Sequence, residues 1–581
     1  MMFSSASRTL VLALLTLGAS ASRGGTPTVS YNVSAAETYL PNKDYSNEQL
    51  ALLWYQVGPV ATHPVVTATV EPTPEPSWAG PGEFHPFVAS NYPEELAVAK
   101  LPPGFNWGMT SSAYQLEGAA KDEGRGPSIW DLLSHRNPNQ VADNSTGDVL
   151  AQHYYLYKQD FQRLAKYGSP YYSTSISWPR IFPFGKGPIN EAGIKHYDDV
   201  IAELVKHGIK PALSLFHWDT PLALFNEYGG WTNPKIVDDY LNYAKFVIAR
   251  YDKHVPVWFT FNEPQYCNWQ YSYYPAGILY PSYGIGPGIN ARFICGHYTL
   301  LAHAKLAKWY HNEFKGKGRI SFKNSGNYYQ PVTNSTGDLE AAKRATDFSI
   351  GWFGGPWTDG DYPQSLKDTL GEILPTLSKA EKALIKGSCD FYALDGYTAF
   401  YVSELPGGAN ACARNRSDPN YPECGSSSQV APNGFSIGPA ADAGASWLKS
   451  TPTGIRKFLS AITKEIFPAV KDIVVSEFGF AEPFESEYAS VPDAIWDLRR
   501  TDYIQGFLDN ILLAITEDHV NVTGAYIWSI MDNFEWGSGI KTRFGMQYVS
   551  YDTLTRTPKA SWFQARNWFK RHGGEFLPGA E

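Results

Sequence analysis

Two glutamates, each at the end of a short apolar run, could together hydrolyse a glycosidic bond. Glu263 follows an apolar run at residues 254–259, within the segment Thr-Phe-Asn-Glu-Pro, and Glu477 follows a second run at residues 472–476. In glycoside hydrolysis one carboxylate attacks the anomeric carbon, a second carboxyl protonates the leaving oxygen, and water then releases the sugar. The two carboxyls must lie about 5 to 5.5 Å apart for retention and about 6.5 to 9.5 Å apart for inversion. The folded chain therefore has to bring the two glutamates together.

Taken alone, the Asn-Glu-Pro segment is more readily explained by a glutamate in a surface loop. The surrounding elements must therefore show whether Glu263 lies in such a loop or in an active site. From residue 105 onward, short apolar runs alternate with helical patterns. We expect strands at 105–110, 169–178, 211–218, 254–263, 319–328, 390–397, 472–477 and 522–528. We expect helices at 152–167, 191–207, 297–314 and 501–516, and a further helix that begins at Pro234 with Asn233 as its cap.

Eight such units predict an α/β fold, a (β/α)8 TIM barrel with long βα-loop insertions, in place of an open doubly wound sheet. No glycine-rich dinucleotide fingerprint follows the first strand. Because barrel active sites lie at the C-terminal ends of the strands, both glutamates are expected on one rim. Residues 403–447, rich in Gly, Pro, Ser and Asn, follow the sixth strand and predict a loop on this face that selects the far part of a substrate.

The composition limits the partners. The chain has 581 residues and a net charge of -9 without a block of like charges, which argues against nucleic acid and anionic membranes as partners. Aromatic residues make up 15% of the chain, and their flat faces can stack on sugar rings. No cofactor is expected, and the sequence gives no oligomeric state.

The first hundred residues differ from the rest. Arg8, an apolar run at 10–17 and small residues at 18–21 have the order of a secretory signal peptide, with cleavage expected after Ala21. Residues 22–100 are a proline-rich extension in which Ser46 and Gln49 have capping-box spacing and predict one short helix. A linker and a functional arm are both compatible with this extension, and the hydrolase domain is expected at 101–575.

Five sequons fit a secreted glycoprotein, and they lie at Asn32, Asn144, Asn334, Asn415 and Asn521. Cys412 and Cys424 flank a short polar loop, which predicts a disulfide between them in an oxidising compartment. The pairing of the remaining cysteines, Cys267, Cys295 and Cys389, stays open, and at least one of them is expected to be a buried free thiol.

Several segments in order resemble glycoside hydrolase family one, the β-glucosidase family, from about residue 100 to about residue 572. They are Phe-Asn-Trp-Gly-Met-Thr-Ser-Ser-Ala-Tyr-Gln-Leu-Glu-Gly at 105–118, Phe-His-Trp-Asp at 216–219, Gly-Gly-Trp at 229–231, Thr-Phe-Asn-Glu-Pro at 260–264, Trp-Ser at 528–529 with Asp-Asn-Phe-Glu-Trp at 532–536, and Arg-Phe-Gly at 543–545. The resemblance implies a retaining β-glycosidase that removes terminal non-reducing β-D-glucosyl, or β-galactosyl, residues by double displacement.

The same resemblance implies the role of each site residue. Glu263 would be the acid/base, Glu477 the nucleophile, and Asn262 the partner of the sugar 2-hydroxyl. Tyr397 would hydrogen-bond the nucleophile, and Trp528 would be the stacking platform. The other hydroxyls would be held by Gln115, His217, Trp218, Glu535 and Trp536. No metal is expected, because Phe-His-Trp-Asp has no second histidine at zinc-ligand spacing.

Three positions depart from the family pattern. Ser173 stands where the family usually has an Arg close to the nucleophile, Phe478 stands where an Asn is usual, and Asp395 replaces another Asn. Without this cation the ionised form of the nucleophile would be less stable, unless another positively charged group substitutes for the Arg.

Two other readings stay open. A glycan-binding or receptor-like barrel protein of low activity would explain the departures around Glu477. An endo-acting glycanase of another barrel family would explain Glu263 but not Glu535 and Trp536. The presence of both glutamates argues against a thioglucosidase, in which the acid/base position is not acidic.

Overall fold

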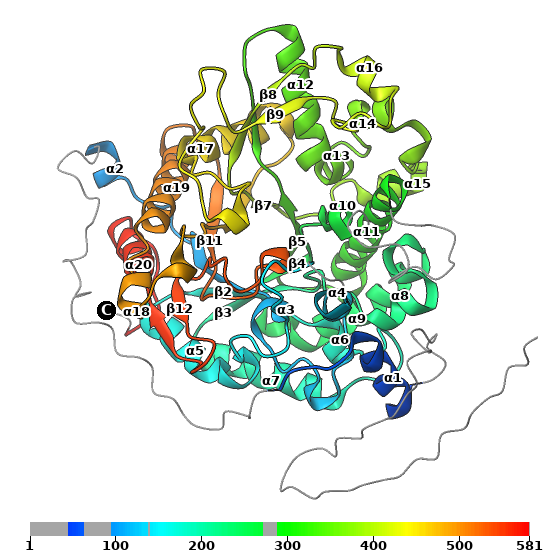
Figure 1. Ribbon diagram of the computed structural model, residues 1–581, viewed down its shortest axis with the longest axis vertical. Coiled ribbons are helices and arrows are strands. Elements are labelled where there is room, and N and C mark those ends of the chain that lie inside the picture. Colours follow the sequence, from blue (N-terminus) through cyan, green and yellow to red (C-terminus); the bar gives the residue numbers. More distant parts are fainter. Residues whose placement is uncertain (1–44, 63–93, 137–139, 271–287, 580–581) are drawn as a thin grey trace, which may run out of the picture.

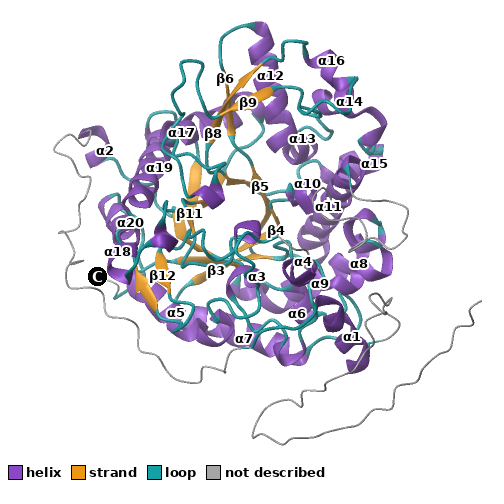
Figure 2. Cartoon of the chain, in the orientation of Figure 1, coloured by secondary structure: helices purple, strands orange, loops and turns teal. Residues whose placement is uncertain are grey.

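The structure, a computed structural model, describes residues 45–62, 94–136, 140–270 and 288–579. Eight parallel strands close into a barrel in the order β1-β11-β10-β7-β5-β4-β3-β2, and helices surround it (Figures 1 and 2). The predicted (β/α)8 barrel is therefore confirmed. Among the described residues, no helix combines the length and apolarity that a bilayer crossing requires.

All eight predicted barrel strands are present. They are β1 (Asn106–Thr110), β2 (Tyr171–Ser175), β3 (Lys210–Ser214), β4 (Val257–Asn262), β5 (Arg319–Ser325), β7 (Tyr392–Asp395), β10 (Ile473–Phe478) and β11 (Val522–Trp528). The run predicted at 319–328 is interrupted, because the chain leaves the barrel after Ser325 and enters β6 (Tyr328–Pro331), which pairs with β8 (Ala399–Ser403). A third strand, β9 (Ser426–Ser428), completes this small sheet, and β12 (Gln547–Val549) pairs with β13 (Arg556–Pro558).

Long helices cover the barrel. They are α5 (His153–Tyr167), α7 (Glu191–Lys206), α9 (Lys235–Tyr251), α11 (Ile289–Trp309), α12 (Thr336–Thr346), α17 (Pro452–Ala461), α19 (Leu498–Thr516) and α20 (Ala560–Arg571). The start predicted at residue 297 for α11 is wrong, because the apolar residues before it continue the helix back to Ile289. At α9, Asn233 accepts a hydrogen bond from the Lys235 N–H, as expected of a cap.

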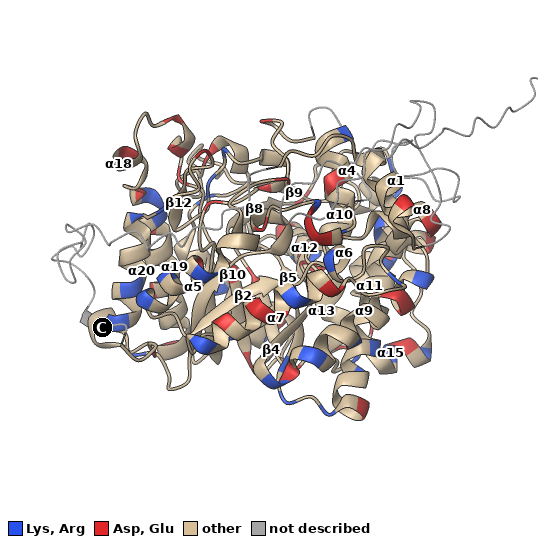
Figure 3. Ribbon diagram, turned by 90° about the horizontal axis from the view of Figure 1, so that it is seen from below, with Lys and Arg blue, Asp and Glu red and all other residues tan. Residues whose placement is uncertain are grey.

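Short helices lie in the connections. They are α2 (Glu94–Val98), α3 (Ala113–Leu116), α4 (Ile129–Arg136), α6 (Trp178–Ile181), α8 (Leu222–Tyr228), α10 (Tyr266–Gln270), α13 (Trp352–Thr358), α14 (Gln364–Leu370), α15 (Lys379–Ile385), α16 (Ala409–Ala413) and α18 (Val491–Ala494). Basic and acidic residues are interspersed over the outer helices in the view of Figure 3. This distribution agrees with the absence of a charged block in the sequence.

The short helix predicted in the N-terminal extension is confirmed as α1 (Asn47–Val57), and Ser46 accepts a hydrogen bond from the Gln49 N–H at its start. Trp54 is 2% exposed, and its indole N–H donates to the Arg125 carbonyl at 2.9 Å. This part of the extension packs against α4 and is bonded to α8 through Asn226 (Figure 1). The signal segment 1–21 and Asn32 lie outside the described residues.

Two disulfides are formed. Cys412 pairs with Cys424, and Cys267 pairs with Cys295, which leaves Cys389 as the free cysteine. The first links α16 to the segment before β9 within the region 403–447, and the second joins α10 to α11. Each therefore ties down a segment that follows a barrel strand.

Candidate active site

A β-bulge turns the end of β4 toward the barrel interior. The pairing of β4 with β5 shifts register between Phe259 and Asn262. Phe259 belongs to the apolar cluster inside the barrel, whereas Thr260 bonds His303 of α11 and Phe261 stacks on Tyr240 of α9. Two successive residues thus face the helices. The side-chain alternation is reset by this bulge, and Asn262 and then Glu263 face the pocket.

A similar bulge occurs in β10. Its register shifts after Val475 relative to both neighbouring strands. Ser476 donates to Asp395 and Glu477 accepts from Tyr397, so both face the pocket, whereas Phe478 stacks on Phe507 of α19 at 5.9 Å. The Phe478 departure therefore places an apolar ring against the helical layer.

The two predicted catalytic glutamates lie together. Glu263, Glu477 and Asp395 each contribute one carboxylate oxygen to a group of three oxygens that all lie within 4.8 Å of one another. This closeness fits the retaining arrangement, in which the carboxyls are about 5 to 5.5 Å apart, better than the wider inverting one. Glu263 is half-buried, Glu477 is 5% exposed and Asp395 is 1% exposed.

Glu477 accepts hydrogen bonds at both oxygens. The Tyr397 hydroxyl donates to Oε1 at 2.6 Å, and the Lys323 ammonium donates to Oε2 at 3.0 Å. Lys323, on β5, is 1% exposed, and its Nζ lies 5.3 Å from the centre of the Phe259 ring. A donor and a cation both favour a charged carboxylate, as a nucleophile requires.

Glu263 and Asp395 have the opposite environment. Burial raises the pKa of Glu263 well above its usual range, and the nearby Asp395 and Glu477 carboxyls add to this effect. Burial likewise raises the pKa of Asp395 to about 8, with Glu477 as the main neighbouring charge that adds to it and Lys323 opposing it. The raised pKa favours the protonated form of Glu263, which is the form that can donate a proton.

Aromatic and polar side chains from other strands surround the glutamates. The His217 ring lies 6.0 Å from the Trp528 ring and 5.8 Å from the Trp536 ring, and the Trp218 and Trp536 rings are 4.4 Å apart. Burial, followed by the charge of Lys323, holds the pKa of His217 well below its usual range, so its imidazole is neutral. The predicted sugar-holding residues thus meet at one rim.

Several buried oxygens at this rim have no hydrogen-bond partner among the described residues, and two of them belong to predicted sugar-holding residues. These two are Oδ1 of Asn262 and Oε2 of Glu535. Asn262 Nδ2 lies 3.3 Å from Nε2 of His217. Because unpaired buried acceptors are costly, oxygens that face a pocket in this way are suited to hydroxyl groups of a ligand. Burial and then Glu477 raise the pKa of Glu535 to about 8.

Gln115 lies at the same rim with its side chain already bonded. Its amide N–H donates to the Phe534 carbonyl at 2.8 Å, and its Oε1 accepts from Ser112 at 2.6 Å. The bond to Phe534 connects the loop after β1 to the loop that carries Glu535, and the bond from Ser112 orients the Gln115 side chain. Gln115 therefore also fixes the relative position of two loops.

Three backbone positions at the rim are strained. Glu263, Trp218 and Trp536 have φ values of 43°, 71° and 45°, in the left-handed region that residues with a Cβ seldom adopt. Such conformations persist where surrounding packing imposes them, and they cluster at functional sites. Trp528 and Ser529 are joined by a cis peptide bond.

Lys323 is a residue of this site that the sequence reasoning did not identify. It stands in a strand that was predicted, and a lysine between Phe322 and Asn324 was the available signal. Ser173, where a cation was expected, is 1% exposed, and its hydroxyl has no partner among the described residues. The cation beside the nucleophile therefore comes from β5, across the barrel from β2.

The region 403–447 contributes one aromatic ring near the site. Trp447 is 42% exposed, and its ring meets the Tyr397 ring edge-on at 5.6 Å. Since Tyr397 contacts Glu477, this segment lies beside the catalytic pair, where a rim was predicted.

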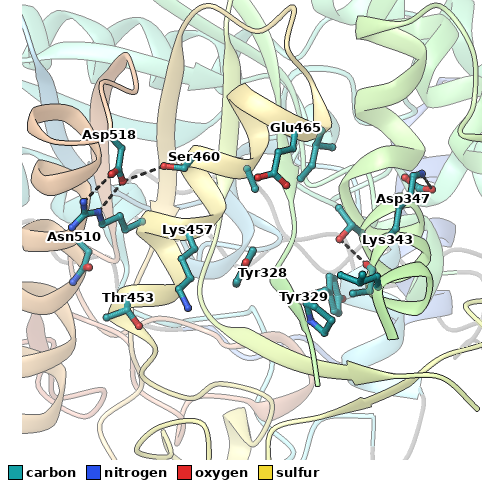
Figure 4. A pocket seen from close by; sticks show the side chains of 17 residues that line it. Tyr328, Tyr329, Lys343, Asp347, Thr453, Lys457, Ser460, Glu465, Asn510 and Asp518 are labelled. Atoms are coloured by element: carbon teal, nitrogen blue, oxygen red, sulfur yellow. Dashed lines mark hydrogen bonds and ion pairs between the residues drawn. The ribbon is translucent and has the colours of Figure 1, made fainter. Parts of the chain in front are cut away.

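A separate pocket of about 840 Å³ lies between α12 and α17 (Figure 4). Its charged side chains bond within or beside it: Lys343 pairs with Asp347, and Arg456 pairs with Asp518. None of the predicted catalytic or sugar-holding residues lines this pocket.

The chain resembles known glycosidases over most of its length. Residues 97–572 match the profile of glycosyl hydrolase family 1. Raucaffricine-O-β-D-glucosidase of Rauvolfia serpentina is 37% identical over 84% of this chain and 94% of its own, and β-glucosidase 1B of Phanerodontia chrysosporium is 38% identical over 83% of this chain and 88% of its own. A rice β-glucosidase variant, solved in a covalent complex with glucose, superposes with a TM-score of 0.73 at 33% identity over 80% of this chain and 99% of its own.

Proposed function

The chain belongs to glycosyl hydrolase family 1 and is a retaining β-glucosidase, and we propose that Glu263 is its acid/base and Glu477 its nucleophile. The observation that carries this assignment is the unequal environment of the pair. Glu477 is bonded by Lys323 and Tyr397, whereas burial and neighbouring carboxyls raise the pKa of Glu263. A nucleophile must be charged and an acid must hold its proton.

In the first step Glu477 attacks the anomeric carbon while Glu263 gives its proton to the glycosidic oxygen, and the bond to the leaving group breaks. In the second step Glu263, now a carboxylate, takes a proton from water. The water oxygen attacks the anomeric carbon and releases Glu477, which restores both groups. A covalent intermediate of this kind is also consistent with the glucose complex of the rice relative.

The sugar-holding roles follow from the family resemblance, and we propose them here because the arrangement of the rim is compatible with them. The unpaired Asn262 Oδ1 accepts a bond from the 2-hydroxyl, where stabilisation in the transition state is strongest. Glu535 Oε2 and the neutral His217 hold further hydroxyls, and Trp528 supplies a stacking face. Gln115, Trp218 and Trp536 complete this rim.

The experiment is a mechanism-based label. A 2-deoxy-2-fluoro-β-glucoside with a dinitrophenol leaving group should inactivate the enzyme and add one sugar to the peptide that contains Glu477. Glu477→Gln should take no label while keeping the wild-type melting temperature within a few degrees. Label on another residue, or inactivation of Glu477→Gln at the wild-type rate, would refute the assignment.

The relatives leave the choice between β-glucosides and β-galactosides at the level of a proposal. Both sugars carry the 2-hydroxyl that Asn262 faces, so we propose activity on both, with preference for glucosides. Rates on the two aryl glycosides at equal concentration measure this preference. The alternative of a poorly active glycan-binding barrel is not favoured, because the pair and the sugar-holding residues are assembled.

We also propose that the protein is secreted and N-glycosylated. Two disulfides and the exposed sequon residues Asn144, Asn334, Asn415 and Asn521 support this proposal. N-terminal sequencing of protein recovered from the culture medium should start at Ser22. Mass spectrometry before and after deglycosylation should show which of the sequons carry glycans.

A further inference from the structure

Three carboxyls share the catalytic pocket, but only one of them is bonded to a cation. Glu263, Asp395 and Glu477 lie within 4.8 Å of one another through their carboxylate oxygens. Among the described residues, the ion pair found in this cluster joins Lys323 to Glu477. Three carboxylates with one ammonium group would leave two uncompensated negative charges in a buried space, which is strongly unfavourable.

We propose that Lys323 is the positioning residue that makes Glu477, and not Glu263 or Asp395, the ionised member of this cluster. The inference deepens the proposed function, since it explains how two similar glutamates acquire different roles. It also assigns to β5 the charge that the family resemblance led us to expect at Ser173 on β2.

The main chain of Lys323 supports the same role. Its carbonyl accepts a hydrogen bond from the Glu263 N–H at 3.0 Å, while its ammonium bonds Glu477 at 3.0 Å. One residue is thus bonded to both members of the pair. The ammonium lies over the Phe259 ring, which closes the pocket from the barrel interior and holds the charge near the carboxylates.

Lys323 is matched to this role by its surroundings. The titratable groups that face it are Glu477, Asp395, Glu263 and His217. Burial opposes its charge, but Glu477 and Asp395 outweigh burial and raise the pKa of Lys323. These shifts favour the charged form of Lys323 and the protonated forms of Glu263 and Asp395, so they limit the net charge of the cluster.

Asp395 has a distinct bonding pattern. Its Oδ1 accepts from Ser476 at 2.6 Å, and its Oδ2 has no partner among the described residues. A protonated Asp395 resembles the Asn of the family pattern in shape and in its ability to donate one hydrogen bond. If Lys323 were absent, Asp395 would be the carboxyl that competes most directly with Glu477 for ionisation.

The test measures nucleophilic attack alone, as the rate of inactivation by the dinitrophenyl 2-fluoro-glucoside, whose good leaving group makes protonation unimportant. Lys323→Met should slow inactivation about 100-fold and move the acid limb of its pH profile about one unit higher, because protons then compete better for Glu477. Lys323→Arg, which keeps the charge, should recover most of the rate. Arg556→Met is the matched control, since Arg556 is also buried and ion-paired, with Asp160. It should leave the acid limb in place.

A second variant keeps the test decisive if Lys323→Met does not fold. Lys323→Gln retains a donor without the charge and should show the same shift of the acid limb with a smaller loss of rate. Adding Asp395→Asn to either variant should restore part of the rate, because it removes the competing carboxyl. An unshifted acid limb in Lys323→Met or Lys323→Gln would overturn the inference, even if wild-type labelling at Glu477 confirmed the proposed function. Failure of wild-type labelling would refute the function instead.

Discussion

The Tyr397 hydroxyl lies 2.6 Å from Oε1 of Glu477, the oxygen that Lys323 does not bond. Tyr397 is itself held in place, because its carbonyl accepts a hydrogen bond from the Tyr503 hydroxyl of α19 at 2.8 Å. The nucleophile is thus restrained from both sides of its carboxylate. Its orientation depends on the helical layer as well as on its own strand.

Tyr397→Phe should lower kcat/KM about 10- to 100-fold, because a hydrogen bond to a charged group contributes about 1.5 to 3 kcal/mol. Hydrolysis of an aryl β-glucoside at several pH values measures the loss. Tyr401→Phe, on the neighbouring strand β8 and half-buried, is the control and should keep the wild-type rate. Equal effects of the two substitutions would contradict a specific role of the Tyr397 hydroxyl.

Glu263→Gln should separate substrates by leaving group. Cellobiose hydrolysis should fall by about 1000-fold or more, whereas formation of the glycosyl-enzyme from a dinitrophenyl glucoside should change little, because proton transfer matters least when the leaving group is stable as an anion. A burst of dinitrophenolate followed by slow turnover is the expected trace, since the second step still needs a base. A uniform loss on both substrates would show that Glu263 is not the acid.

Without ligand, stability should decline as the pH rises from about 4 to 8. The pKa of Glu535 is raised to about 8 by burial and then by Glu477, so the folded state holds its proton where the unfolded chain, with a pKa near the usual value of about 4.3, has lost it. The contribution of protonated Glu535 to the free energy of unfolding is present in full below the unfolded pKa and is lost as the pH rises through the folded pKa.

In the wild type the free energy of unfolding should fall with pH over this window, and Glu535→Gln should reduce the steepness of this fall by about 1 kcal/mol per pH unit. Denaturant titrations at pH 5, 6, 7 and 8 give the slope. Glu487→Gln, at an exposed position, should follow the wild type. Parallel curves for wild type and Glu535→Gln would disprove the assignment of a neutral Glu535.

Lys559→Met should destabilise the fold by about 3 to 5 kcal/mol, because it removes one of the two cations that pair with each of two buried carboxylates, Asp532 and Glu485. Lys559 bonds Asp532 at 2.7 Å, and Asp532 in turn accepts from the Gly545 N–H, so the pair fixes the loop that carries Glu535. Chemical denaturation measures the change. Lys195→Met removes an exposed pair with Asp199 and should leave the denaturation midpoint close to that of the wild type.

The barrel could be predicted because most of its strands lie in apolar runs that alternate with helical patterns, although β2 and β5 are largely polar. The partners of the sugar were predictable only through the family resemblance, since His217 or Trp528 alone is equally compatible with core packing. The second disulfide was not predictable, because the separation of Cys267 and Cys295 says nothing about the approach of α10 to α11.

Lys323 could not be identified for a different reason. A lysine in a strand can face solvent, a neighbouring helix or the barrel interior, and the direction depends on the register of β5 against β4. That register includes the bulge between Phe259 and Asn262. A bulged strand cannot be distinguished from a regular strand by its sequence, so the direction of the Lys323 side chain could not be predicted.

The bulges in β4 and β10 make the activity sensitive to length as well as to residue type. Deleting one residue between Phe259 and Asn262, or between Val475 and Glu477, would leave every catalytic side chain in the gene product and still permit eight strands to pair. The side chain of each glutamate would then point out of the pocket and toward the surrounding helices. A single-codon deletion at either place is thus a way to obtain a folded barrel that keeps both catalytic glutamates and has no glycosidase activity.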